Sequence, residues 1–91
     1  MLNSDKIHYD TVKEIVINAI NQVMIDNELP IQEIKENKSI ISDFNFSSLM
    51  VAQLILLIQE EINLEPFSNG YTISDMLTVS DYIKVYSGGI Q

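Results

Sequence analysis

Two adjacent serines, at the start of the most apolar segment, are the residues of this chain best placed for chemistry. Ser47 and Ser48 end a polar turn that begins at Asp43, and a predicted helix follows at once. A serine hydroxyl is a favoured N-cap, because it accepts a hydrogen bond from an otherwise unpaired amide of the first turn. The second hydroxyl then lies at the positive end of the helix dipole, where a phosphate group is stabilised.

Catalysis by either serine has no support in the sequence. The only histidine, His8, lies at the uncertain start of the first predicted helix, and a serine nucleophile needs a base within hydrogen-bond reach. There is no cysteine, which excludes disulfides, thiolate metal sites and a cysteine nucleophile. Asp43 is separated from Glu60 and Glu61 by a whole helix, and no loop has the alternating acids of a calcium site. We predict no catalytic residue and no metal site, and we interpret His8 as a surface imidazole.

Length and charge indicate one small acidic domain. The 91 residues, 46% of them hydrophobic, are enough for a single core. We expect one domain over residues 1–91, with its core at about 10–86 and loose ends at 1–9 and 87–91. Nucleic acids and anionic lipid surfaces would repel a chain with a formal net charge of −8, so basic proteins are the expected partners. No signal peptide or membrane span is evident, and we expect a soluble, cytoplasmic monomer.

Hydrophobic periodicity predicts an all-α fold, a small bundle of three main helices and one short helix. The expected helices are, in chain order, residues 10–25, 48–62, a short piece at 72–77 and a last helix from Thr78 to about Tyr86. Asp81, three residues after Thr78, completes a capping box at the start of the last helix. Gly88 and Gly89 then end that helix.

The first helix has several possible starts, and a long connection follows it. Thr11 and Glu14 have the spacing of a capping box, although Asp10 or Ser4 could begin the helix instead, which would make 4–9 an extra turn. Residues 28–47 are expected to be ordered, because long connections in compact domains are usually tied down by their own apolar side chains. The expected ties are Ile31, Ile34, Ile40 and Phe44.

The second helix is apolar on nearly every side. Its expected inner face consists of Leu49, Leu54, Leu57, Ile58 and Ile62. Four further apolar residues are Met50, Val51, Ile55 and Leu56. They could all belong to the core. Because one helix of such a small bundle cannot be enclosed on every side, we expect some of the four to reach the surface near the serines and to form a patch for a partner.

The segment from Asp43 to Leu49, Asp-Phe-Asn-Phe-Ser-Ser-Leu, resembles the attachment motif of acyl carrier and peptidyl carrier proteins. In that family the pattern is an acid, a hydrophobic residue, usually a glycine, two variable positions, the modified serine and a leucine. The resemblance implies that Ser48 receives 4′-phosphopantetheine and that Leu49 is the buried residue after it. The similarity extends over about residues 10–86, including the long loop and the Thr-Val-Ser-Asp element at 78–81.

Alignment to the motif gives each residue of the turn a role. Asp43 matches the family's acid, and Phe44 matches the hydrophobic residue. Asn45 replaces the usual glycine, and asparagine is the best substitute where the backbone must be left-handed. If Ser47 were the modified residue, leucine would no longer follow directly and the spacing to Asp43 would shorten. We therefore assign the attachment to Ser48 and the N-cap to Ser47.

The resemblance also implies a cofactor and a set of partner enzymes for this chain. A phosphopantetheinyl transferase would transfer the arm from coenzyme A, and the arm's thiol would hold an acyl, aryl or aminoacyl group as a thioester. Partners would be loading and processing enzymes of acyltransferase, adenylation, ketosynthase or condensation type. They would dock on Met50, Val51, Gln53, Ile55 and Leu56. Because Met50 and Gln53 replace acids common in fatty-acid carriers, polyketide or nonribosomal peptide metabolism is favoured. The alternative is an unmodified helical interaction domain of the same fold.

Overall fold

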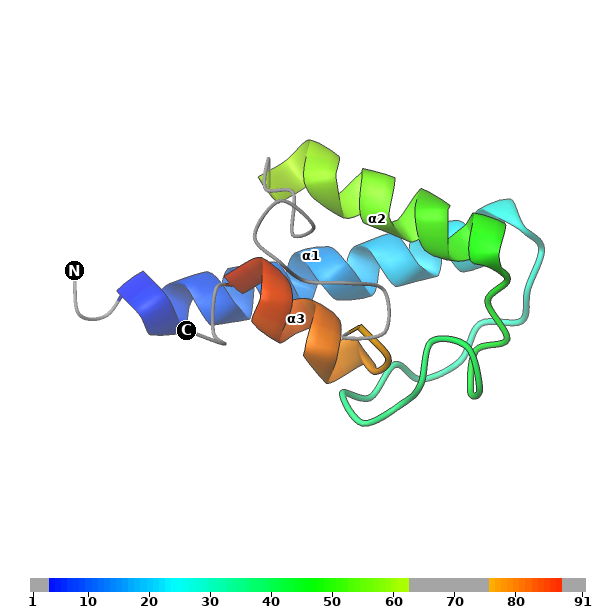
Figure 1. Cartoon of the computed structure of the whole chain (residues 1–91), viewed down its shortest axis with the longest axis horizontal. Coiled ribbons are helices and arrows are strands. Elements are labelled where there is room, and N and C mark those ends of the chain that lie inside the picture. Colours follow the sequence, from blue (N-terminus) through cyan, green and yellow to red (C-terminus); the bar gives the residue numbers. More distant parts are fainter. Residues whose placement is uncertain (1–3, 63–75, 88–91) are drawn as a thin grey trace.

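A computed structural model describes residues 4–62 and 76–87, with side chains from Tyr9 onward. Its helices are α1 (Ser4–Asp26), α2 (Ser48–Ile62) and α3 (Val79–Ser87). α1 packs against both other helices, and the long connection from α1 to α2 runs around one end of the bundle (Figure 1). The predicted all-α fold is confirmed. The short helix predicted at 72–77 lies outside the described residues except for its last two positions, which are not helical.

α1 begins at the earliest of its predicted starts. The helix includes 4–9, so the extra turn considered for that segment is present. Thr11 and Glu14 lie inside the helix, and the capping box predicted there is wrong because the residues before them are already helical. The buried stripe of α1 consists of Val12, Val16, Ala19, Ile20, Val23 and Met24. Its spacing of three and four residues is that of the predicted amphipathic helix.

A Schellman motif ends α1. The Leu29 N–H donates to the Met24 carbonyl at 2.9 Å, and the Glu28 N–H donates to the Ile25 carbonyl at 3.1 Å. These two bonds satisfy carbonyls that the end of a helix leaves unpaired. The motif needs a left-handed residue, and Glu28 supplies it with φ 59°. Glycine is the usual residue at this position because it has no Cβ to clash with the backbone.

Backbone hydrogen bonds tie the connection to the start of α3. Ser39 and Thr78 form an isolated antiparallel bridge, and the Ile40 N–H donates to the Leu77 carbonyl at 2.9 Å. Of the predicted ties, Ile40 and Phe44 are buried and Ile34 packs partly against the core, as expected. Ile31 is 72% exposed, so its predicted role is wrong. It lies well before the bridge that brings the connection onto the core.

The capping box predicted for the last helix is confirmed. Thr78 Oγ1 accepts from the Asp81 N–H at 3.1 Å, and Asp81 Oδ2 accepts from the Thr78 N–H at 3.0 Å. The buried residues of α3 are Val79, Tyr82, Ile83, Val85 and Tyr86. In the described part of the chain, no helix combines the length and the apolar character that crossing a membrane requires.

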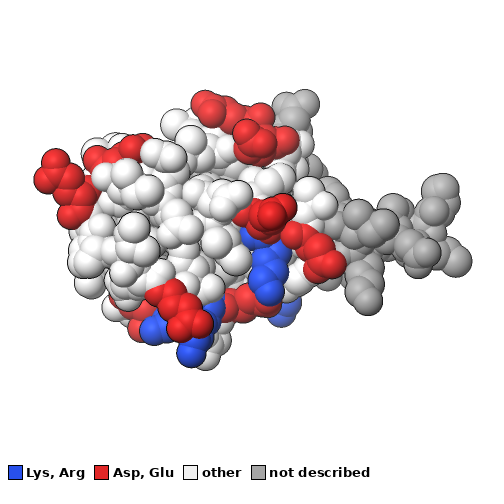
Figure 2. All heavy atoms as spheres, turned by 180° about the vertical axis from the view of Figure 1, so that it is seen from behind, with Lys and Arg blue, Asp and Glu red and all other residues white. Residues whose placement is uncertain are grey.

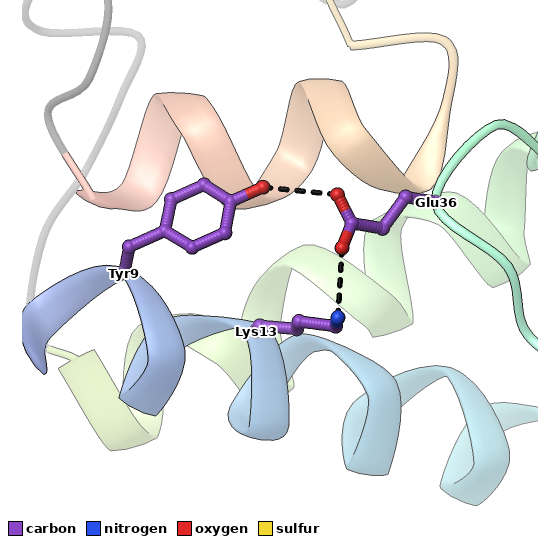
Figure 3. Close-up of polar contacts among 3 residues, drawn as sticks. All are labelled: Tyr9, Lys13 and Glu36. Atoms are coloured by element: carbon purple, nitrogen blue, oxygen red, sulfur yellow. Dashed lines mark hydrogen bonds and ion pairs between the residues drawn. The ribbon is translucent and has the colours of Figure 1, made fainter. Parts of the chain in front are cut away.

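A polar cluster fastens the connection to α1 (Figure 3). Glu36 accepts a hydrogen bond from the Tyr9 hydroxyl at 3.0 Å and forms a 2.8 Å ion pair with Lys13. The Lys13 ammonium, followed by the Tyr9 hydroxyl, lowers the pKa of Glu36, because both stabilise the ionised carboxylate. The cluster was not predicted, since it joins residues that are far apart in the sequence.

Candidate functional site

The site begins with a tight turn that ends the connection. Asp43 Oδ2 accepts from the Ser39 N–H at 2.7 Å, while the Asp43 N–H donates to the Ser39 carbonyl at 3.0 Å. The Ser42 N–H donates to Ser39 Oγ at 3.0 Å. Asp43 is exposed, but its carboxylate is used to close the turn. The acid of the predicted motif therefore shapes the backbone that leads to the serines.

Two buried rings anchor the turn on either side of Asn45. Phe44 and Phe46 are both buried, with ring centroids 6.4 Å apart and planes tilted by 55°. Asn45 between them has φ 61°, the left-handed conformation that its alignment with the family's glycine predicted. Position 46 is variable in the motif, so the burial of Phe46 was not predicted. The available signal was the apolar character of Phe46 itself, because large apolar side chains are usually buried.

Ser47 and Ser48 have the two positions that the sequence predicted. Ser47 Oγ accepts from the Met50 N–H at 3.3 Å, and the Ser47 carbonyl accepts from the Val51 N–H at 2.9 Å. Ser47 is therefore the N-cap, and Ser48 is the first residue of α2. Ser48 is exposed, and its hydroxyl has no hydrogen-bond partner within the described residues.

The electrostatics at Ser48 suit a negatively charged group. The first amides of a helix point outward without intrahelical partners, and the dipole adds a partial positive charge. The first turn of α2 contains no acidic residue that would repel an anion. An exposed hydroxyl at this end can therefore carry a phosphodiester in favourable surroundings. Within the described residues there is no group of three or more potential metal ligands.

The orientation of α2 differs from the prediction. Its buried residues are Met50, Val51, Leu54, Ile55 and Ile58. This is the spacing of one helix face, and Leu49 and Leu56 lie on the opposite face, 68% and 60% exposed. The burial predicted for Leu49 is therefore wrong. Four apolar residues of this helix were expected to supply a partner patch at the surface. Of these, only Leu56 is exposed. The prediction is wrong for Met50, Val51 and Ile55, which are buried in the core.

Gln53, the remaining residue of the predicted docking set, joins two helices. It is half-buried, and its Oε1 accepts from Asn27 Nδ2 at 3.0 Å. The same Nδ2 donates to the Val23 carbonyl at 2.8 Å. Asn27 therefore links the end of α1 to the middle of α2. The exposed apolar surface beside Ser48 is formed by Leu49, Ala52 and Leu56, which we call the outer face of α2.

Comparisons with known proteins support an acyl-carrier fold. No protein-family model and no curated protein sequence matches the chain. Its structure is similar to the solution structure of MacpD, an acyl carrier protein from Pseudomonas fluorescens involved in mupirocin biosynthesis. The TM-score is 0.80 with 26% sequence identity, covering 94% of this chain and 77% of MacpD. With its long ordered connection leading to a serine at the start of α2, this chain has the fold of an acyl carrier protein.

Proposed function

We propose that this chain is a carrier protein that bears a 4′-phosphopantetheine arm on Ser48. The observation that carries the proposal is the position of this hydroxyl: exposed, first in α2, and next to a serine that already serves as N-cap. Similarity to an acyl carrier protein supports it. The two serines have different tasks, since Ser47 holds the helix start and leaves the Ser48 hydroxyl available.

The residues present fit the attached group. Ser48 Oγ would form the phosphodiester, losing its proton while coenzyme A releases the nucleotide part as leaving group. The positive end of α2 would stabilise the phosphodiester's negative charge. The turn closed by Asp43 and the buried Phe44 and Phe46 would hold the attachment point in place. When bound, the arm supplies the thiol that a cysteine-free chain lacks, and the thiol carries an acyl, aryl or aminoacyl thioester.

Partner enzymes would bind next to the arm. The outer face of α2 offers Leu49 and Leu56 for short-range apolar contact. The net charge of −8 would attract basic surfaces and accelerate their encounter. The proposed partners are a phosphopantetheinyl transferase and loading or processing enzymes. The absence of acids from the first turn of α2, together with the similarity to MacpD, favours polyketide or nonribosomal peptide metabolism over fatty-acid synthesis.

Intact-protein mass spectrometry tests the proposal. The chain is incubated with coenzyme A, Mg²⁺ and a broad-specificity phosphopantetheinyl transferase, and one arm per chain is expected. Ser48→Ala should abolish the mass gain, whereas Ser47→Ala, the matched neighbouring substitution, should keep it. A chain that gains no mass, or that gains it after Ser48→Ala, contradicts the proposal. The Ser48→Ala variant cannot carry the arm. If a partner nevertheless binds it as tightly as the parent chain, the alternative of an unmodified interaction domain would be favoured.

A further inference from the structure

A groove runs between α1 and α2. It consists of two adjoining hollows of about 260 and 240 Å³ that share Leu57 and Glu60. The first has Ile15 and Ala19 of α1 in its wall, and the second has Val23 of α1 and Leu56 of α2. The two helices run antiparallel side by side along it (Figure 1). We call this surface the α1–α2 groove.

The dimensions of the groove suit a helix. Its α1 wall extends from Ile15 to Asp26 with lining residues every three or four positions. At 1.5 Å per residue this wall is about 16 Å long, which is three helical turns. The walls combine apolar side chains with the polar Asn18, Gln22 and Gln53. A groove of this length can accept the apolar stripe of an amphipathic helix, in the helix-in-groove mode of recognition.

The rim of the groove is acidic. Glu61 lines the first hollow, Asp26 lines the second and Glu60 lines both, and no lysine lines either hollow within the described part of the chain. Neither glutamate forms an ion pair with a described residue, and Lys13 of α1 is already paired with Glu36. Figure 2, the view from behind, shows acidic side chains in several separate patches with uncharged surface between them.

We propose that the α1–α2 groove binds a basic amphipathic helix of a partner protein, whose apolar stripe fills the groove while its flanking lysines or arginines pair with Asp26, Glu60 and Glu61. A second copy of this chain is disfavoured as occupant, because each copy has a net charge of −8 and like charges repel. The interaction goes beyond the carrier role. It needs no modification of Ser48, so its failure and that of the proposed function are distinguishable.

Fluorescence anisotropy with a labelled peptide tests the proposal. The probe is a helical peptide of about four turns with leucines on one face and flanking lysines, and the control peptide has glutamates in place of those lysines. Two triple variants of the full chain have the same net charge. Asp26→Asn with Glu60→Gln and Glu61→Gln alters the rim, and the control triple is Asp10→Asn, Glu14→Gln, Glu33→Gln. We expect about tenfold weaker binding of the lysine peptide to the rim variant, and a change below about twofold for the control triple.

The outcomes separate this site from general charge attraction. Equal weakening by both triple variants, or equal binding of the glutamate peptide, would overturn the proposal. Leu56→Lys is a further variant that should fold, because Leu56 is 60% exposed, and it should also weaken binding of the lysine peptide. Backbone amide NMR shifts should change along α1 and α2 at the groove. Ser48→Ala should leave binding unchanged, and loss of binding in that variant would refute an arm-independent site.

Discussion

The assignment of different tasks to two adjacent serines predicts that their alanine variants fail in different assays. Ser47→Ala removes the hydroxyl that accepts from the Met50 N–H at 3.3 Å. Loss of an N-cap serine costs about 0.5–2 kcal/mol of folding free energy. The bond is slightly longer than the usual range and Ser47 is exposed, so water can partly replace it and we expect about 1 kcal/mol. In a domain of this size that corresponds to a fall in Tm of about 4–8 °C.

Ser48→Ala should have little effect on folding. Ser48 is the first helical residue, is exposed, and its hydroxyl has no hydrogen-bond partner in the described part of the chain. Alanine is the better helix former by up to about 0.5 kcal/mol. The free energy of unfolding should therefore stay the same or rise slightly. In the phosphopantetheinylation assay the effects are reversed. Ser48→Ala should lose the modification and Ser47→Ala should keep it, because only the Ser48 hydroxyl is proposed to be modified.

Urea unfolding followed by circular dichroism at the helix band measures both stabilities on unmodified protein. The slope with urea should be the same for the two variants and the parent chain, so that a shift in midpoint reports a change in stability. Equal stability losses in both variants, or no loss in Ser47→Ala, would refute the capping assignment. A folded Ser47→Ala chain that is not modified would show that the two tasks are not separate.

Three further predictions follow from the described contacts. Glu28→Gly should stabilise the chain by about 0.5–1 kcal/mol in urea unfolding, because it relieves left-handed strain, although glycine also gains freedom when unfolded. Leu54→Ala should cost about 2–5 kcal/mol and Leu49→Ala much less than 1, since only the first is buried; similar costs would contradict the observed orientation of α2. Burial raises the pKa of Tyr82 to about 12, above its ordinary value of 10, so the contribution of Tyr82 to the free energy of unfolding should be constant below pH 10 and fall from there towards pH 12. Tyr82→Phe should remove that part of the decline in alkaline unfolding curves.

Local structure could be predicted because it depends on neighbouring residues. Asn45 in a left-handed turn, Ser47 as N-cap, and the Thr78–Asp81 capping box are decided within four positions of the chain. Each is a hydrogen bond or a steric preference that the residue types alone express. The general architecture followed from the same signals, since capped, periodic segments separated by a long connection allow few compact arrangements.

The orientation of α2 could not be predicted for a physical reason. The helix is apolar on nearly every side, so burying one face or another gains similar hydrophobic free energy. The choice is made by packing against α1, including the Asn27–Gln53 hydrogen bond, which joins residues 26 positions apart. The hydrogen bond from Tyr9 to Glu36, which was not predicted either, joins residues 27 positions apart. Such long-range contacts leave no local pattern in a single sequence.

The corrected orientation brings the proposed attachment site and the groove onto connected surfaces. Leu49 and Leu56 are seven residues apart on the outer face of α2, and Leu56 also lines the α1–α2 groove. Gln53, the first α2 residue at the groove, is five residues from Ser48, about 7–8 Å along the helix axis. One partner could therefore contact the groove and the outer face together. When a partner is bound at one of these surfaces, its effective concentration at the other surface is raised. Modest affinity at each surface would therefore suffice to hold an enzyme beside the arm.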